Sequence, residues 1–247
     1  MKNRSFSTVK NIAQQLQARL HRKEWAQTGK LPGQRQLADE LGVSRASLRE
    51  AITMLEALGL LRSEPGRGVF IVAQDKNGLT NVQQRRLFVG RYALADVHMV
   101  RAQLEVLAVT LAARTITPDG LDRLRATVAQ MQMAAAVGDL VTMAEGDHAF
   151  HACIFEIAAS PLMLDIVENI NDVVERSRQV AFAEPARVSE PIAEHARIID
   201  ALADGSPERA VQAMREHLRN VADRTGVHLE ISGAIAIAAV IPFVNHS

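Results

Sequence analysis

The sequence of 247 residues is poor in several residue types, and each shortage excludes a class of protein. A single cysteine, Cys153, rules out an intrachain disulfide. Aromatic residues make up only 4% of the chain, which favours helices over a β-sandwich. The longest apolar run, 234–244, is too short to span a bilayer, and the polar N-terminus is unlike a signal peptide. We therefore expect a mainly helical, cytoplasmic protein with no membrane partner.

The net charge of the chain is zero, but its two parts carry opposite charge. Residues 1–73 contain 12 lysines and arginines against 6 acidic residues, whereas residues 74–247 contain 16 against 22. A basic block joined to an acidic one indicates a module that binds a polyanion, fused to a second unit with another task.

The order of elements in the basic block predicts a winged helix-turn-helix over residues 5–73. Apolar residues recur at helical spacing in the first and third segments, Ser44 is placed to cap the third, and a glycine-rich turn at 64–68 joins two short apolar strands. The expected helices cover residues 8–24, 34–41 and 45–58, and the expected strands cover 60–62 and 69–72.

A recognition helix enters the major groove of DNA with its N-terminal residues. Arg45 and Arg49 are four residues apart and project from one face of the expected helix, where arginine can pair with guanine or phosphate. Gly66 and Gly68 would let the tip of the wing approach a groove, with Arg67 between them. The predicted DNA contacts are Arg35, Ser44, Arg45, Ser47, Arg49, Gly66 and Arg67.

The rest of the chain is predicted to be a linker (74–90), an all-α antiparallel bundle for effector binding and dimerisation (91–225) and an apolar tail of unassigned structure (226–247). Three helix starts are marked by a capping residue before a proline: Thr117-Pro118, Ser160-Pro161 and Ser206-Pro207. The expected helices cover residues 94–115, 118–137, 140–158, 161–182, 190–203 and 207–225.

Four residues of the helical part could share a metal ion. Asp147 and His151 are four residues apart and lie on one face of a helix, while His195 and His217 belong to two later helices. Three imidazoles and one carboxylate suit a divalent transition metal such as Zn²⁺, Ni²⁺ or Mn²⁺. On spacing alone such histidines are more often surface or capped residues than ligands, because an Asp and a His four residues apart are common in helices.

Several segments of the basic block resemble the GntR family of winged-helix regulators. They are Leu31-Pro-Gly-Gln-Arg-Gln-Leu-Ala38, Leu41-Gly-Val-Ser-Arg45, Leu48-Arg-Glu-Ala51, Leu55-Glu-Ala-Leu-Gly-Leu60 and Gly66-Arg-Gly-Val-Phe70. The chain departs from the family pattern at Gly33-Gln34, where Ser-Glu is usual, and at Ala46, where Pro or Thr is frequent. The resemblance implies that Arg35, Arg45, Arg49 and Gly66 contact DNA.

The helical part resembles the FCD ligand-binding domain of the FadR-type branch of that family. The resemblance rests on Asp147-x-x-Phe-His151, on the later histidines His195 and His217, and on the opening helix from Arg101 to Ala113. It implies that the four candidate ligands bind a metal that leaves positions open to a small carboxylate effector. It also implies that Arg101 faces this cavity, although an ion pair with Glu105 explains Arg101 equally well.

These observations favour a DNA-binding regulator over an enzyme. We expect a homodimeric repressor of a metabolic operon that binds a pseudo-palindromic operator on double-stranded DNA and responds to a small organic acid. A metal-dependent hydrolase with an accessory DNA-binding head is an alternative, but no motif supplies its general base. A DNA-binding protein that responds to no effector is the other alternative.

Overall fold

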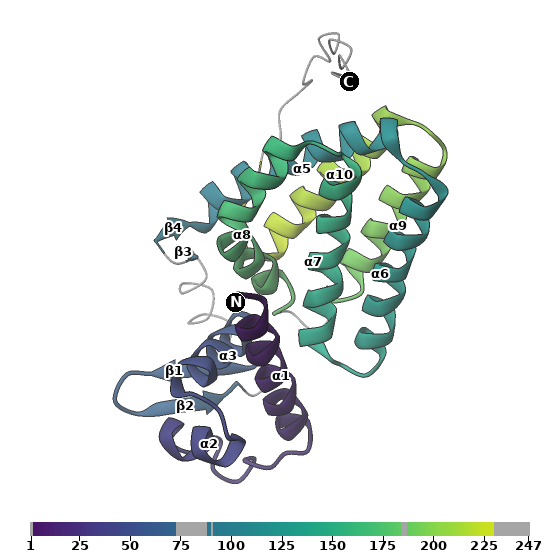
Figure 1. Cartoon of the computed structure of the whole chain (residues 1–247). Coiled ribbons are helices and arrows are strands. Elements are labelled where there is room, and N and C mark those ends of the chain that lie inside the picture. Colours follow the sequence, from purple (N-terminus) through teal and green to yellow (C-terminus); the bar gives the residue numbers. More distant parts are fainter. Residues whose placement is uncertain (1, 73–87, 90, 184–186, 230–247) are drawn as a thin grey trace.

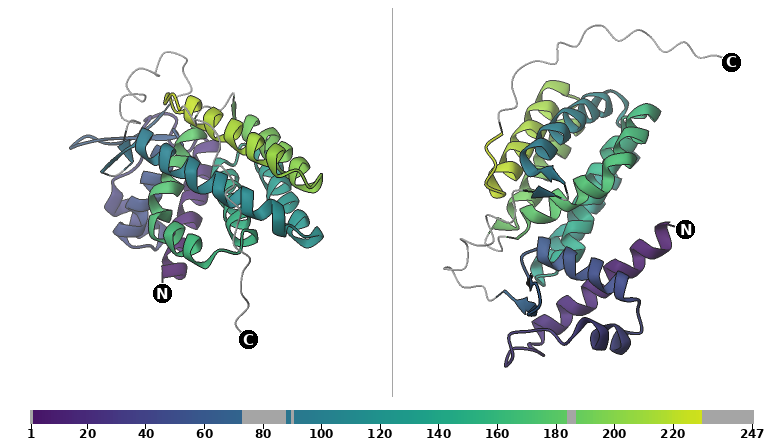
Figure 2. Two further views of the ribbon diagram at one scale, coloured as in Figure 1. Left: turned by 90° about the horizontal axis from the view of Figure 1, so that it is seen from above. Right: turned by 90° about the vertical axis from the view of Figure 1, so that its left-hand side faces the viewer.

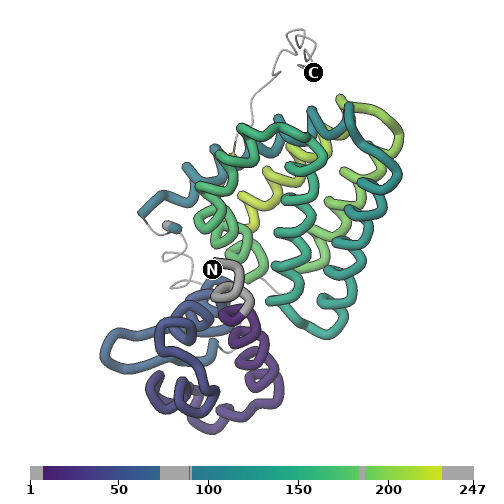
Figure 3. Tube along the Cα trace, in the orientation of Figure 1, coloured from purple at the N-terminus to yellow at the C-terminus, as the bar shows by residue number. Residues whose placement is uncertain are grey.

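The computed structural model describes residues 2–72, 88–89, 91–183 and 187–229. Within these ranges the chain forms nine α-helices and four short strands, arranged as a small head and a larger helical half (Figures 1 and 3). The prediction of a mainly α fold with an N-terminal winged helix is confirmed. None of the described helices combines the length and the apolar character needed to cross a membrane.

The head contains three helices and a two-stranded antiparallel sheet. They are α1 (Lys2–His21), α2 (Gln34–Leu41), α3 (Arg45–Ala57), β1 (Leu61–Glu64) and β2 (Gly68–Ile71), with Leu61 opposite Ile71. The first helix was expected over 8–24, so its predicted bounds were wrong at both ends. It begins earlier because no helix breaker separates the polar residues 2–7 from the apolar ones, and it ends before Lys23, whose φ is 59°.

Local signals fix the turns around the recognition helix α3. Gly42 adopts a left-handed conformation with φ 66° and ends α2, and the Ser44 hydroxyl accepts a hydrogen bond from the Ser47 amide at 3.0 Å. Gly59 follows α3 with φ 73°, and a Cβ atom placed on it would lie 3.0 Å from the Cβ of Ala183. The turn after α3 therefore lies directly against Ala183 of the helical half.

The helical half consists of six helices preceded by a small hairpin. The helices are α5 (Leu94–Thr115), α6 (Pro118–Ala136), α7 (Leu140–Ile157), α8 (Pro161–Ala181), α9 (Glu190–Ala203) and α10 (Pro207–Arg224), and each agrees with its predicted bounds to within a residue. The hairpin of β3 (Phe88–Val89) and β4 (Tyr92–Ala93) was not predicted. Most of the expected linker and of the apolar tail lies outside the described residues.

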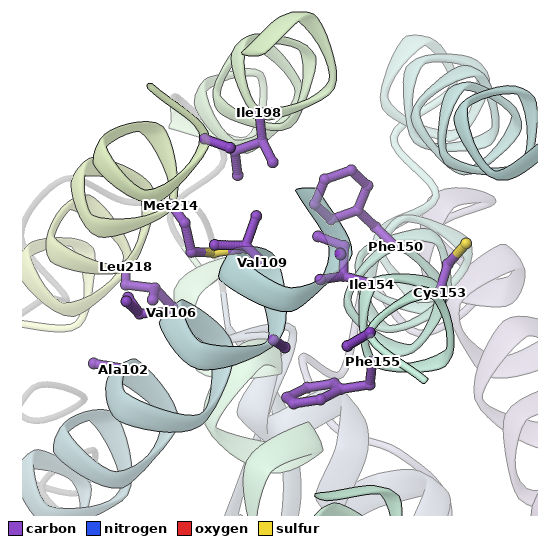
Figure 4. Close-up of a cluster of buried hydrophobic side chains, with 14 of the residues drawn as sticks. Ala102, Val106, Val109, Phe150, Cys153, Ile154, Phe155, Ile198, Met214 and Leu218 are labelled. Atoms are coloured by element: carbon purple, nitrogen blue, oxygen red, sulfur yellow. The ribbon is translucent and has the colours of Figure 1, made fainter. Parts of the chain in front are cut away.

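These helices pack side by side around one apolar core (Figure 2). Helix α5 contributes Val106 and Val109, which meet Phe150 and Ile154 of α7 and Met214 of α10 in the core shown in Figure 4. The single cysteine, Cys153, is buried in the same core as a free thiol, so it packs as a small apolar residue.

A second apolar cluster joins the head to the helical half. Ile12 and Leu16 of α1 belong to the same cluster as Leu140 and Val141 at the start of α7. Phe182, at the end of α8, is also part of it. The head is thus packed against the bundle through a continuous hydrophobic interface.

Candidate metal centre and nucleic-acid interface

The predicted DNA contacts lie at the surface of the head. Arg45 and Arg49 are exposed on α3, and Arg35 is exposed near the start of α2. Ser44 caps the first turn of α3 by accepting from the Ser47 amide, and the hydroxyls of the two serines lie 2.9 Å apart. The structure therefore places exposed arginines around the N-terminal end of a capped helix. This is the arrangement that a groove-binding helix needs.

The wing carries more positive charge than the sequence pattern suggested. Gly66 and Gly68 have φ angles of 73° and 112°, which favour glycine. The charged groups of Lys30, Arg62 and Arg67 lie 5.5, 5.9 and 5.6 Å from the centre of the Phe70 ring. Lys30 and Arg62 were not among the predicted contacts. Lys30 lies far from the wing in the sequence, and the bridge between Lys30 and Phe70 brings it there.

The four predicted metal ligands meet inside the helical half. Asp147 and His151 come from α7, His195 from α9 and His217 from α10, and all four are buried. One potential ligand atom of each lies within 4.8 Å of those of the others. The structure thus brings residues as far apart in the sequence as 147 and 217 to one point, as a shared metal site requires.

The orientation of His217 is fixed by a buried carboxylate. Its Nδ1 lies 2.7 Å from Oε2 of Glu194, which leaves its Nε2 facing Nε2 of His151 at 3.2 Å. His195 is held differently, because its ring stacks on that of Phe150 with 3.8 Å between centroids. Its Nε2 lies 3.5 Å from Oδ1 of Asp147.

Two arginines and a glutamate of α5 and α8 lie next to the cluster. Glu105 on α5 accepts hydrogen bonds from Nε of Arg101 at 3.0 Å and from Nη2 of Arg178 at 2.7 Å. Its second oxygen lies 2.6 Å from Nδ1 of His151. Arg101 is therefore paired with Glu105, yet its Nη1 has no hydrogen-bond partner, and neither does Nε of Arg178.

Burial sets the protonation of this cluster. Burial lowers the pKa of His151 to about 4, and burial together with the neighbouring His217 and His151 lowers the pKa of His195 well below its ordinary value. Burial alone would raise the pKa of Glu105, but Arg101, His151 and Arg178 hold it well below its usual range. His151 and His195 are therefore neutral and Glu105 is ionised near pH 7.

This donor set fits a divalent transition metal. Nδ1 of His151 and Nδ1 of His217 each lie beside a carboxylate, and the two Nε2 atoms face each other at 3.2 Å. A neutral imidazole that carries its proton on Nδ1 presents a lone pair at Nε2. Two facing lone pairs repel unless a cation lies between them, and the low pKa of His151 disfavours a proton in that place. Nitrogen donors about 2.1 Å from a shared metal satisfy this arrangement.

Sequence reasoning missed two residues of the cluster, Arg178 and Glu194. Both reach it from helices whose register around the site is set by tertiary packing, and neither stands at metal-ligand spacing. The neighbouring His148 lies outside the four-residue group, with its Nδ1 3.4 Å from Nη1 of Arg178.

Comparison with known proteins relates both halves to one type of regulator. Residues 8–71 match the model of "Bacterial regulatory proteins, gntR family", and residues 96–220 match that of the "FCD domain". The chain is 28% identical over 199 residues to the HTH-type transcriptional regulator LutR of Bacillus subtilis, covering 78% of this chain and 90% of LutR.

Two further matches agree with this relationship. The chain is 28% identical over 229 residues to the Glc operon transcriptional activator of Escherichia coli K12, covering 86% of each. The solved structure of E. coli McbR/YncC superposes with a TM-score of 0.51 at 20% identity, covering 90% of this chain and 97% of the other, and so supports the fold.

These curated relatives are transcriptional regulators and not enzymes, which decides against the hydrolase alternative. The matched regions coincide with the head and with the helical half of the structure. This protein belongs to the GntR family of bacterial transcriptional regulators, with an FCD domain as its helical half.

Proposed function

We propose that the protein is a homodimeric repressor of a metabolic operon, and that a small carboxylate effector bound beside a divalent metal controls its affinity for the operator. The metal would be Zn²⁺, Ni²⁺ or Mn²⁺, held by Asp147, His151, His195 and His217.

The observation that carries the proposal is the double role of α7. This helix supplies Asp147 and His151 to the cluster, and its N-terminus is bound by Gln17 of the DNA-binding head. Gln17 donates to Oδ1 of Asp139 at 3.0 Å and accepts from the Val141 amide at 3.2 Å. A shift of α7 on ligand binding would therefore act directly on α1 and change the position of the head.

Two buried N–H groups support an anionic effector. Nη1 of Arg101 and Nε of Arg178 are enclosed without a hydrogen-bond partner, and such groups are costly unless a ligand satisfies them. Both arginines contact Glu105 at the edge of the metal cluster. A carboxylate that bound the metal through one oxygen could accept from these donors through the other.

A second copy of the chain would place two heads on the two halves of a pseudo-palindromic operator. Exposed apolar side chains occur on α5 and α8, which pack against each other, and they are suited to a contact between copies. The exposed residues are Met99, Val100, Leu107, Leu162, Leu164 and Ile166.

The direct test is operator binding with and without candidate effectors. Zinc-loaded protein is titrated against DNA from upstream of its own gene, in the presence of sugar acids, hydroxy acids and dicarboxylates in turn. We expect one class of acid to weaken binding. An effector that tightens binding would refute release of the operator by the effector, and no response to any acid would refute control by a carboxylate.

The metal centre is tested separately by His195→Ala. This change removes one of four ligands, so we expect the purified variant to lose its bound metal in elemental analysis. His148→Ala is the matched control, because His148 belongs to α7 but lies outside the ligand group. Full metal retention in the His195→Ala variant would refute the assigned site.

A further inference from the structure

One buried carboxylate beside the metal cluster has a set of partners that fixes its chemistry. Glu194 lies on α9 directly before His195, and only 3% of its surface is exposed. Its neighbours come mainly from one face of α10, where His217, Asn220 and Arg224 stand at positions three and seven residues apart.

Four donors surround the two carboxylate oxygens of Glu194. Oε1 accepts from Nη1 of Arg224 at 2.8 Å and from Nδ2 of Asn220 at 3.0 Å. Oε2 accepts from Nη2 of Arg224 at 2.9 Å and lies 2.7 Å from Nδ1 of His217. The arginine is bound through both oxygens, which is the strongest geometry for such a pair.

This arrangement determines which nitrogen of His217 carries the proton. An ionised carboxylate only accepts hydrogen bonds, so Nδ1 of His217 must be the donor at 2.7 Å. In a neutral imidazole the other nitrogen, Nε2, then has the free lone pair. That lone pair points at the metal cluster, since Nε2 of His217 lies 3.2 Å from Nε2 of His151.

We propose that Glu194, held by Arg224, is a positioning residue that keeps His217 in the tautomer and orientation that bind metal through Nε2. The inference rests on the metal centre proposed above and assigns a role to a residue outside its four ligands. Partners of this kind orient metal-binding histidines and raise the basicity of the ligating nitrogen.

His195 provides a comparison inside the same cluster. Neither of its ring nitrogens has a hydrogen-bond partner, and its ring is held by stacking on Phe150 at 3.8 Å between centroids. Packing alone does not distinguish one tautomer from the other. The metal-binding form is therefore preset at His217 by Glu194, whereas at His195 it is selected only when the metal binds.

A purely structural role for Glu194 would be to tie α9 to α10 through Arg224. Glu190, one turn earlier on α9, also contacts Arg224, with 3.1 Å between Oε2 and Nη1. It is more exposed than Glu194, and its other described partner is Arg187, to which it is bound through both oxygens. The change Glu190→Gln therefore weakens the link between the helices without touching His217, which makes it the matched control.

The first experiment measures Zn²⁺ affinity of the metal-free full-length protein by competition with a chelator. In E194Q the amide nitrogen cannot accept from Arg224, so the oxygen turns to the arginine and the amide faces Nδ1 of His217 as a donor. We expect this variant to bind Zn²⁺ about 10- to 100-fold more weakly than the wild type. E190Q should stay within about twofold of the wild type.

The second experiment needs no variant and so does not depend on whether E194Q folds. Zinc-loaded wild-type protein labelled with ¹⁵N at histidine should show His217 with a protonated Nδ1 and a metal-bound Nε2. Metal bound through Nδ1 would overturn the inference. Equal affinity of the wild type and E194Q, or an equal loss in E190Q, would also overturn it while leaving the metal centre intact. A wild type that bound no Zn²⁺, Ni²⁺ or Mn²⁺ would overturn both.

Discussion

The head and the helical half both concentrate charged groups, but they treat them in opposite ways. In the head, Arg35, Arg45 and Arg49 are exposed, and the guanidinium of Arg67 stands at the tip of the wing with 73% of its side chain exposed. In the helical half, the charged groups around the metal cluster, such as Arg101, Glu105 and Arg178, are enclosed and neutralise one another. The exposed set is suited to a long polyanion, whereas the enclosed set is out of reach of one.

The difference in burial explains how one chain can hold both sets of charged groups. Exposed arginines need no partner within the protein, because water solvates them until DNA replaces it. Buried charges need partners at all times, and Arg101, Glu105 and Arg178 supply them to one another. A shift of α5 against α8 would therefore break contacts between buried charges, which is energetically costly.

The largest expected effect comes from Arg45→Ala at the exposed site. Loss of one well-placed arginine from a recognition helix removes contacts worth about 1–3 kcal/mol, so operator affinity should fall by about 10- to 100-fold. Fluorescence anisotropy on labelled operator DNA measures this effect.

The same variant also tests the separation of the two sites. Metal content and oligomeric state should equal those of the wild type, because Arg45 is exposed on α3, outside the helical half. Unchanged operator affinity would remove Arg45 from the interface, and a parallel loss of metal would break the proposed separation.

The exposed site was the easier one to predict from the sequence. Its residues lie within one short segment, 35–67, and its turns carry local signals, such as the Ser44 cap and the left-handed Gly42 and Gly59. The wing cluster was predicted only in part, because the place of Lys30 beside Phe70 depends on a bridge between distant segments.

For the enclosed site, the sequence predicted the four candidate metal ligands but not the residues that hold them. Asp147 and His151 share a helix, and helical bounds were readable from three Ser/Thr-Pro starts. The partners Arg178 and Glu194 could not be predicted, because their contacts follow from the rotation of α8 and α9 about their own axes. That rotation is set by apolar packing across the whole bundle.

An intermediate effect is expected where the two regions meet. Gln17→Leu removes the amide that donates to Asp139 and accepts from the Val141 amide, leaving buried polar groups at the start of α7 unsatisfied. The difference in operator affinity between metal-free and zinc-loaded protein should shrink by about tenfold, since couplings of this kind are worth about 1–3 kcal/mol.

Gln15→Leu is the control for this change, because Gln15 is exposed on α1 and bonds only to Asn11 among the described contacts. Operator affinity is measured for both variants with and without Zn²⁺. An undiminished response to Zn²⁺ in the Gln17→Leu variant would show that the contact between α1 and α7 does not transmit the signal.

The smallest effect concerns acid, which should act on the enclosed groups and spare the exposed ones. His98 of α5 is buried, with its Nε2 3.0 Å from the Thr225 hydroxyl, and burial and the nearby Arg101 lower its pKa to about 3, despite the opposing charge of Glu105. An unfolded chain takes up a proton at this residue near pH 6.5, whereas the folded chain does not. Folding stability contributed by the neutral form is therefore present above pH 6.5 and is lost as the pH falls towards 3.

At pH 6 this loss amounts to about 1 kcal/mol for one such histidine, which His98→Gln should abolish. Between pH 8 and pH 6, the Tm of metal-free wild-type protein should therefore fall by about 2–4 °C more than that of the variant. The other buried histidines with lowered pKa, His148, His151 and His195, remain in both proteins and cancel in the comparison. An equal fall in both proteins would mean that His98 gains its proton without unfolding, and that the enclosed region is more open to water than its packing indicates.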